Sequence, residues 1–187
     1  MIPSIPRSNA LLSSLRDYVF ADAVEATHLA HMRQLCESVA DPFARTTFAP
    51  GHFTASAFVL SPARDALLLI FHAKLLRWLQ PGGHIEAGDL DVLAAARREA
   101  HEEVGIADLT VEQATPFDLD VHQIPSNSRE PAHAHFDLRF LFRANSLAFR
   151  AGSDAKDARW VPLDEITAAL TDDSVLRALA KLRRCGS

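Results

Sequence analysis

Three glutamates near the middle of the chain have the type and spacing of a divalent-cation site. Glu99, Glu102 and Glu103 stand at positions i, i+3 and i+4, and residues with these separations are neighbours on the surface of a helix. Like charges this close repel one another, and the carboxyl end of a helix disfavours anions. A hard cation such as Mg²⁺ or Mn²⁺ would relieve both costs, because such ions bind carboxylate oxygens together with substrate phosphates. A solvated acidic helix face is the alternative explanation.

The residues around the glutamates extend this pattern in both directions. Gly82 and Gly83 precede them, Arg98 adjoins them, and Gly105 follows at a position where glycine ends a helix well. We therefore expect a glycine turn, a helix over about residues 90–104, and a second loop. The helix would dock through an apolar stripe beside the carboxylates, formed by Leu93, Ala96, Ala100 and Val104.

This arrangement resembles the signature of the Nudix hydrolases, whose box is G-x5-E-x7-R-E-U-x-E-E-x-G-U, with U an aliphatic residue. The residues that match it in order are Gly83, Asp89, Arg98, Glu99, Glu102, Glu103, Gly105 and Ile106. Asp89 replaces the first glutamate, eight residues rather than seven separate it from Arg98, and Ala100 stands at the first aliphatic position. The extra residue falls at the start of the helix, where a turn can absorb it.

Two further segments support the resemblance. Residues 160–165, Trp-Val-Pro-Leu-Asp-Glu, are typical of the late region of the family, so the resemblance covers about residues 52–172. Residues 78–84, Trp-Leu-Gln-Pro-Gly-Gly-His, resemble a little-characterised bacterial-type branch. Neither segment indicates a substrate.

The resemblance implies a fold of the α/β (α+β) class, with a mixed β-sheet sandwiched between α-helices. It also implies Mg²⁺-dependent (or Mn²⁺-dependent) hydrolysis of a diphosphate linkage in a nucleoside-diphosphate-type substrate. The metal ligands that it implies are Glu102 and Glu103, with Glu99 beside them and the backbone carbonyl of Gly82 as a further oxygen. Arg98 is expected to pair with Asp89 and a ligand glutamate, and so to orient them.

A general base is needed in addition to the metal, and the box does not fix it. Bound Mg²⁺ neutralises the anionic pyrophosphate and can acidify an attacking water, but a base must still reach that water. Glu130, in a later loop, is the first candidate, and Glu103 is the alternative. Glu86 is either a structural residue of the turn or an outer ligand.

Other polar residues are candidates for substrate binding. Lys74, Arg77 and His84 flank the box and could contact phosphate, although each is equally explained as ordinary surface. On a predicted strand over residues 133–143, His135 and Asp137 lie on one polar face together with His133 and Arg139. We interpret this row as the polar wall of a substrate cleft or as a solvated face of the sheet. The alternative is a zinc site that His122 of the neighbouring strand could join.

The remaining segments complete the predicted domain. Residues 8–40 contain no proline or glycine and are predicted to form one or two helices. Strands are expected over residues 53–60, 66–72, 117–124, 133–143 and 159–162, with a hairpin between the third and fourth, and the tail from residue 163 is expected to be helical. We divide the chain into an N-terminal helical extension (residues 1–50) and a Nudix hydrolase domain (residues 51–187).

Composition narrows the class of protein. With 187 residues, 48% of them hydrophobic, and a net charge of −5, the chain is predicted to be a cytoplasmic globular protein without the basic face that binds nucleic acid. No apolar run is long enough to span a membrane. The predicted partner is a small diphosphate substrate, and the N-terminal helices would serve as a lid or a homodimer contact.

Two other functions within the same fold are less favoured. An isopentenyl-diphosphate isomerase needs an active-site cysteine, whereas Cys36 and Cys185 fall in predicted terminal helices. A nucleotide-sensing regulatory domain commonly loses box carboxylates, whereas this chain keeps all three.

Overall fold

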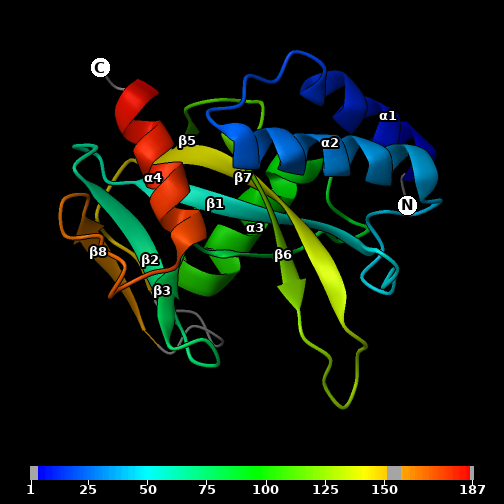
Figure 1. Ribbon diagram of the computed structural model, residues 1–187. Coiled ribbons are helices and arrows are strands. Elements are labelled where there is room, and N and C mark those ends of the chain that lie inside the picture. The colour runs from blue at the N-terminus through cyan, green and yellow to red at the C-terminus, as the bar shows by residue number, and fades with distance from the viewer. Residues whose placement is uncertain (1–3, 151–156, 186–187) are drawn as a thin grey trace.

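The structure is a computed structural model that describes residues 4–150 and 157–185 (Figure 1). The helices are α1 (Ser4–Leu15), α2 (Ala23–Ser38), α3 (Val92–Val104) and α4 (Asp173–Cys185). The strands are β1 (Gly51–Leu60), β2 (Ala66–His72), β3 (Arg77–Leu79), β4 (Gly82–His84), β5 (Leu109–Val111), β6 (Asp118–Ile124), β7 (His133–Ala144) and β8 (Ala158–Pro162).

The strands form one mixed sheet around a parallel pair. β1 and β7 run parallel over ten registered residues, and the other pairings are antiparallel. The main path is β3-β2-β1-β7-β5, with β4 paired to β1, β6 to β7 and β8 to β2. All ten residues of β1 are buried, because the strand has neighbours on both edges and cover on both faces. The predicted mixed sheet and the β6–β7 hairpin are confirmed.

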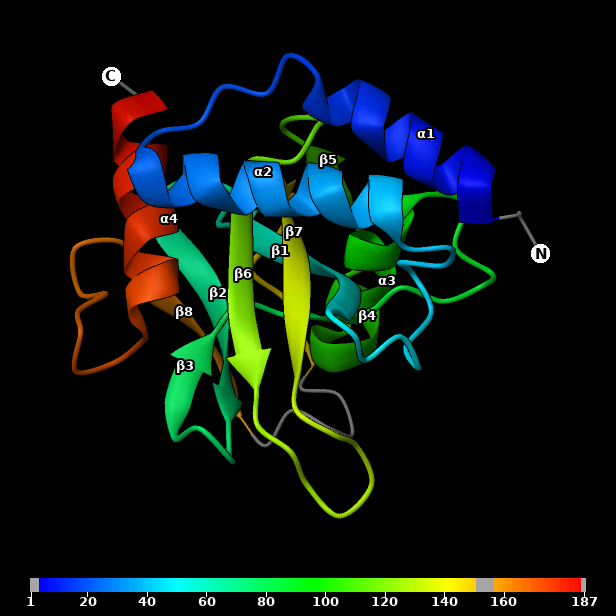
Figure 2. The same cartoon turned by 45° about the vertical axis from the view of Figure 1, so that its right-hand side comes forward.

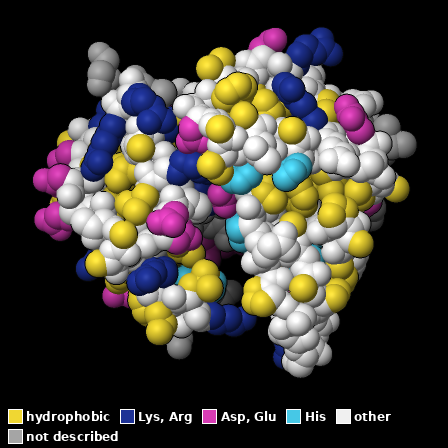
Figure 3. All heavy atoms as spheres, in the orientation of Figure 1, with side chains coloured by type: hydrophobic (Ala, Val, Ile, Leu, Met, Phe, Trp, Pro, Cys, Tyr) yellow, Lys and Arg dark blue, Asp and Glu magenta, His cyan; other side chains and the backbone are white. Residues whose placement is uncertain are grey.

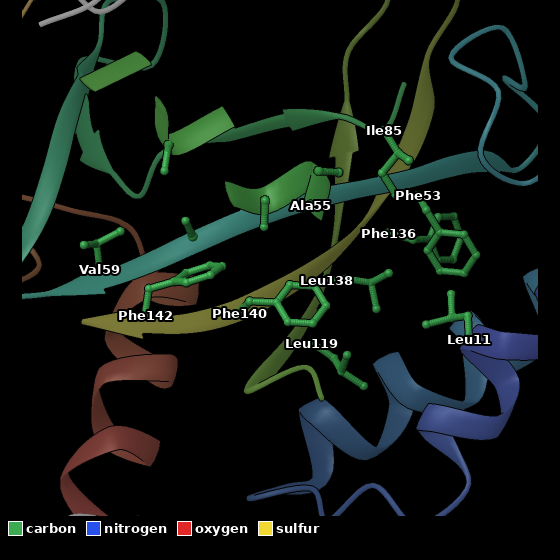
Figure 4. Packing of buried hydrophobic residues seen from close by; sticks show 14 of the residues in the cluster. Leu11, Phe53, Ala55, Val59, Ile85, Leu119, Phe136, Leu138, Phe140 and Phe142 are labelled. Carbon is green, nitrogen blue, oxygen red and sulfur yellow. The ribbon is translucent and has the colours of Figure 1, made fainter. Parts of the chain in front are cut away.

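Helices cover the two faces of the sheet with separate hydrophobic clusters. Phe53, Ala55 and Ala57 point from β1 toward α1, α2 and α3, whereas Phe58 and Leu60 point toward α4. This alternation follows from the two-residue period of a strand. Figure 4 shows part of the first cluster, in which Leu11 of α1 lies beside the aromatic side chains of β1 and β7. The sandwich predicted from the resemblance is confirmed.

The N-terminal helices pack on the sheet, and α2 lies across β6 and β7 (Figure 2). Glu25 of α2 is fully buried and accepts hydrogen bonds from Tyr18 and from Lys181 of α4. Residues of α1 and α2 therefore share a core with the region that follows residue 50. No helix among the described residues is long and apolar enough to cross a membrane.

Some element boundaries differ from the sequence predictions. The region predicted as one or two helices over residues 8–40 forms two, α1 and α2, and α1 begins at Ser4 rather than at residue 8. Asp22 caps the second helix by accepting from the N–H of Glu25. The tail is not helical from residue 163: turns occupy residues 163–172, and α4 starts where Asp172 accepts from the N–H of Val175. The three-residue strands β3, β4 and β5 were not predicted.

Candidate active site

Helix α3 carries the three glutamates and is fixed at both ends. Asp91 caps its start by accepting from the N–H of Ala94 at 2.7 Å, so the helix begins at Val92 rather than at residue 90. Gly105 ends it in the left-handed conformation, with φ 64°, and donates to the carbonyl of His101. Ala96 and Ala100 are fully buried, and such small side chains let the helix pack closely on β1.

Arg98 holds together the acidic groups of the box. Its guanidinium makes two hydrogen bonds to the Asp89 carboxylate, at 3.0 and 3.1 Å, and one each to Glu99 and Glu102, both at 2.9 Å. A fifth bond, at 2.8 Å, reaches the carbonyl of His84 in β4. All five donors of the rigid fork are therefore directed at the box, a geometry that lysine cannot reproduce.

Asp89 organises the turn that precedes α3. Its carboxylate is buried and also accepts from the N–H of Glu86 at 2.7 Å. Arg7 of α1 donates to the carbonyls of Glu86 and Asp89, so the N-terminal helix supports the same turn. The Glu86 side chain is exposed. The additional residue before Arg98 is accommodated in this turn, where Asp89 provides the acidic partner.

The glycines of β4 bring backbone against the glutamates. The N–H of Gly82 donates to Glu103 at 2.9 Å. A Cβ added to Gly83 would stand 2.7 Å from a carboxylate oxygen of Glu99, so glycine is required for this approach. Burial raises the pKa of Glu99, and Arg98 opposes that rise. The hydrogen bond between Gly82 and the box is made by its N–H, and Gly82 also pairs with Ser56 of β1.

The donor set of the box suits a hard divalent cation. Glu99 is half-buried, and Glu102 is exposed with 54% of its side chain accessible. Arg98 and Gly82 hold the three carboxylates by different hydrogen bonds. Carboxylate oxygens are preferred ligands of Mg²⁺, and the i, i+3, i+4 spacing places all three glutamates on one side of α3.

A buried polar network lines the face of the sheet beside the box. Asp137 is 2% exposed and accepts from the hydroxyls of Thr54 and Ser56, and from Arg139. Arg139 is fully buried, and its other carboxylate partners are Asp118 and Asp120. Asp137 was predicted to bind substrate, but in the structure its carboxylate accepts hydrogen bonds from protein side chains and so holds the strands of this polar face together.

Histidines continue this wall toward the open end of the sheet. The rings of His52, His84, His133 and His135 lie near one another, with centroid separations from 4.9 to 5.3 Å. His122 lies opposite His135 in the β6–β7 register, at 5.6 Å. Burial, with repulsion from neighbouring histidines, lowers the pKa of His84 to about 4 and that of His135 to about 3. Both imidazoles are therefore neutral near pH 7.

The other predicted site residues lie on two hairpins of the sheet. Lys74 and Arg77 are exposed in the β2–β3 hairpin, and Glu130 lies in the β6–β7 loop, where it pairs with Arg45 at 3.1 Å. Figure 3 shows the molecule hollowed between these two hairpins, with histidine and acidic side chains near the inner end. Trp78 packs against the hydrophobic cluster that faces α4 and lies under Arg159, so its contacts are structural.

A second hollow is not a candidate for the same chemistry. A cavity of about 370 Å³ lies between α1 and the start of α3, and most of its lining is apolar, including Leu11, Phe43 and Val92. It opens on the sheet face opposite the polar wall. Anionic substrates need convergent polar groups, and the box and its wall provide them.

Sequence reasoning missed the part of the wall that β1 contributes. His52, Thr54 and Ser56 are buried polar residues at alternate positions of an otherwise apolar strand. Their two-residue period was the available signal. It indicates a polar face on one side of β1, adjoining the polar face that was predicted for β7.

Comparison with known proteins decides the family. The family model described as the NUDIX domain matches residues 51–181, which includes β1, the box and most of α4. The chain belongs to the Nudix hydrolase family. The Nudix assignment made from the glycine turn and the glutamate helix is thereby confirmed at the level of the family.

Solved structures share the fold of this Nudix protein. A NUDIX-family hydrolase from Clostridium perfringens is 24% identical with a TM-score of 0.54, and the match covers 72% of this chain and 97% of that one. An Ap4A hydrolase from C. elegans is 18% identical (TM-score 0.55; 71% and 96% covered), and the E. coli dihydroneopterin triphosphate pyrophosphohydrolase is 16% identical (TM-score 0.54; 72% and 96% covered). A search of curated protein sequences gave no significant match.

Proposed function

We propose that this Nudix protein is a Mg²⁺-dependent hydrolase that cleaves a diphosphate linkage in a nucleoside-diphosphate-type small molecule. The observation that carries the proposal is the Arg98 cluster, which holds Asp89, Glu99 and Glu102 in one network beside Glu103. A solvated acidic helix face would not require an arginine that makes five hydrogen bonds to the box, nor the close packing of the β4 glycines against the glutamates. The three carboxylates remain present and positioned, which favours turnover over a purely nucleotide-sensing domain.

The residues proposed to hold the metal are Glu99, Glu102, Glu103 and the backbone carbonyl of Gly82. When bound, Mg²⁺ neutralises phosphate charge and lowers the pKa of a bound water; Mn²⁺ has the same preference for oxygen ligands. Arg98 keeps the ligand carboxylates oriented through its contacts with Glu99 and Glu102. Asp89 fixes Arg98 in turn, so it supports the site without contacting the substrate.

Glu103 is the stronger candidate for the general base. Its carboxylate is half-buried next to Gly82, at the point where β4 meets α3. Glu130 lies in a loop, and its hydrogen bond with Arg45 lowers its pKa, which weakens it as a proton acceptor. Glu130 would instead line the rim of the hollow.

The substrate is proposed to lie in the hollow between the β2–β3 and β6–β7 hairpins. Lys74 and Arg77 are proposed to supply positive charge from the β2–β3 hairpin, where the Arg77 guanidinium also donates to the carbonyl of Ala169 at 3.5 Å. The neutral rings of His84 and His135 would supply hydrogen-bonding groups on the other side. Two structural neighbours are named for Ap4A and for dihydroneopterin triphosphate. These compounds contain phosphoanhydride bonds, and that supports the substrate class proposed for this chain.

A panel of nucleoside diphosphate compounds tests the proposal. The intact protein is incubated with Mg²⁺ and nucleotide sugars, dinucleoside polyphosphates, oxidised nucleotides and non-nucleotide diphosphates, and the products are separated by anion-exchange chromatography. We expect two phosphate-bearing products from at least one compound, and loss of turnover in Glu103→Gln. Tight binding without turnover across the panel would instead support the nucleotide-sensing function, and rearrangement of an isopentenyl chain would support an isomerase.

A further inference from the structure

We propose that His52, His133 and His135 form a binding site for a zinc-type transition-metal ion, separate from the box carboxylates. One ring nitrogen of each residue lies within 4.8 Å of the others, and the Nε2 atoms of His133 and His135 are 3.3 Å apart. Two nitrogens bound to one tetrahedral Zn²⁺ stand about 3.3 Å apart, given Zn–N bonds of about 2.0–2.1 Å. This pair already has the spacing of two ligands.

The pairing of β1 with β7 creates the group. His133 and His135 are two residues apart and so project from the same face of β7. The parallel register places His52 of β1 directly opposite His135. The three rings therefore stand on rigid, neighbouring strands, which is the kind of support that a precise metal site needs.

Backbone carbonyls orient the rings of His52 and His133 so that their Nε2 atoms remain available to bind a metal ion. The Nδ1 atoms of His52 and His133 lie 3.0 Å from the carbonyl of Thr47 and 2.8 Å from that of Pro131. A carbonyl oxygen only accepts, so each Nδ1 carries the proton and each Nε2 presents a lone pair. Metal-binding histidines are oriented in the same way, by donating from the other ring nitrogen.

His52 distinguishes a metal site from a simple hydrogen bond between histidines. The His133–His135 pair alone could be an N–H···N bond donated by His135. His52, however, is 1% exposed, and its Nε2 has no hydrogen-bond partner among the described residues. Buried polar atoms nearly always have a partner. An ion shared with His133 and His135 would supply one.

The chemistry of this trio differs from that of the box. Neutral imidazole nitrogens prefer Zn²⁺ and related transition metals, whereas carboxylate oxygens prefer Mg²⁺. Three protein ligands leave a fourth position open to water or to an anionic oxygen. His84, in the strand that leads into the box, lies 5.2 Å from the His52 ring, so the trio borders the proposed substrate hollow.

Zinc binding to the intact, chelator-treated protein tests the proposal. Zn²⁺ is titrated calorimetrically in excess Mg²⁺, which occupies oxygen sites, and Co²⁺ absorption reports the ligand geometry. We expect one Zn²⁺ per chain and an intense tetrahedral Co²⁺ spectrum. His52→Gln, His133→Gln and His135→Gln should each weaken Zn²⁺ binding at least about a hundredfold. His31→Gln, an exposed histidine of α2, is the matched control, and circular dichroism checks that each variant is folded.

Two further variants separate this site from others nearby. His122→Gln should retain zinc, because its Nδ1 is 3.0 Å from Asp120 and it lies outside the trio. A variant with Glu99, Glu102 and Glu103 all changed to Gln should also retain zinc, even if it shows no hydrolysis. The proposal is overturned if wild-type protein binds no zinc in excess Mg²⁺, if folded trio variants bind it as tightly as wild type, or if the glutamate variant loses it.

Discussion

Replacing Gly83 with alanine perturbs the proposed metal site without changing a glutamate. The added Cβ would stand 2.7 Å from Oε1 of Glu99, and 2.8 Å from its Cδ and its Oε2. Ordinary contact begins near 3.4 Å, so the carboxylate must move by 3.4 − 2.7, or about 0.7 Å. The atoms in the way are the far end of a flexible side chain, so the backbone need not shift. Gly83→Ala should therefore fold normally.

The expected cost of this displacement is catalytic. A misplacement approaching 1 Å can reduce an enzyme rate by about a hundredfold, so we expect kcat to fall by roughly tenfold to a hundredfold and Mg²⁺ to bind more weakly. The assay is the initial rate over a Mg²⁺ series on the best substrate of the wild type, together with Tm by differential scanning fluorimetry.

Gly88 provides a matched control for that measurement, and Gly82 provides a contrasting case in which the backbone is in the way. At Gly88 an added Cβ meets nothing within 4 Å, so Gly88→Ala should behave as wild type. At Gly82 it would meet the Ser56 backbone at 2.8 Å, so Gly82→Ala should lower Tm. If Gly83→Ala and Gly88→Ala have the same rate and the same Mg²⁺ dependence, the placement of Glu99 against Gly83 does not matter for function.

Three further predictions address the supports of the site and the fold. Arg98→Lys loses the bidentate contact with Asp89 and should weaken Mg²⁺ binding about tenfold to a hundredfold by calorimetry; unchanged affinity would contradict the orienting role. Glu25→Gln leaves Lys181 as a buried cation without its carboxylate partner and should lower the free energy of unfolding by about 3–5 kcal/mol in urea, whereas a change under 1 kcal/mol would contradict a structural role for α2. Burial opposes ionisation of Glu25, but Lys181 and Tyr18 hold its pKa below the ordinary value. The ionised Glu25 therefore stabilises the folded protein above about pH 4.3, the pKa in the unfolded chain. This stabilisation is lost as the pH falls through the pKa in the folded protein. The difference in unfolding free energy between wild type and Glu25→Gln should therefore shrink on acidification below that pH, and a constant difference would argue against the depressed pKa.

Local sequence signals predicted the box helix α3 and the longer strands of the sheet. The apolar run at residues 66–72 coincides with β2, and Gly105 ends α3 as expected of a C-cap glycine. These predictions succeeded because helix caps and apolar runs act over a few residues. The start of α3 was misplaced by two residues, because Asp91 was not identified as its cap.

Non-local pairing explains what the sequence did not indicate. His52 lies 81 residues before His133 in the chain, and only the parallel pairing of β1 with β7 brings them together. The short strands β3 and β4 lack a periodic pattern. Each has only three residues, and two of the three in β4 are glycines, so neither shows an alternation of hydrophobic and polar side chains. Arg139 was placed on a polar face, but its complete burial among three aspartates depends on α4 and β6 closing over it.

The dependence of hydrolysis on Mg²⁺ and on the α3 carboxylates decides whether the box is a catalytic metal site. Turnover of a diphosphate substrate is measured for chelator-treated wild type, Glu103→Gln, and Glu37→Gln, which makes the same chemical change on the exposed surface of α2. We predict no turnover without metal, recovery on adding Mg²⁺ in wild type and Glu37→Gln, and a loss of at least about a hundredfold in Glu103→Gln at saturating Mg²⁺. Metal-independent turnover, or equal rates in the two glutamine variants, would contradict a metal-dependent catalytic role for the α3 carboxylates.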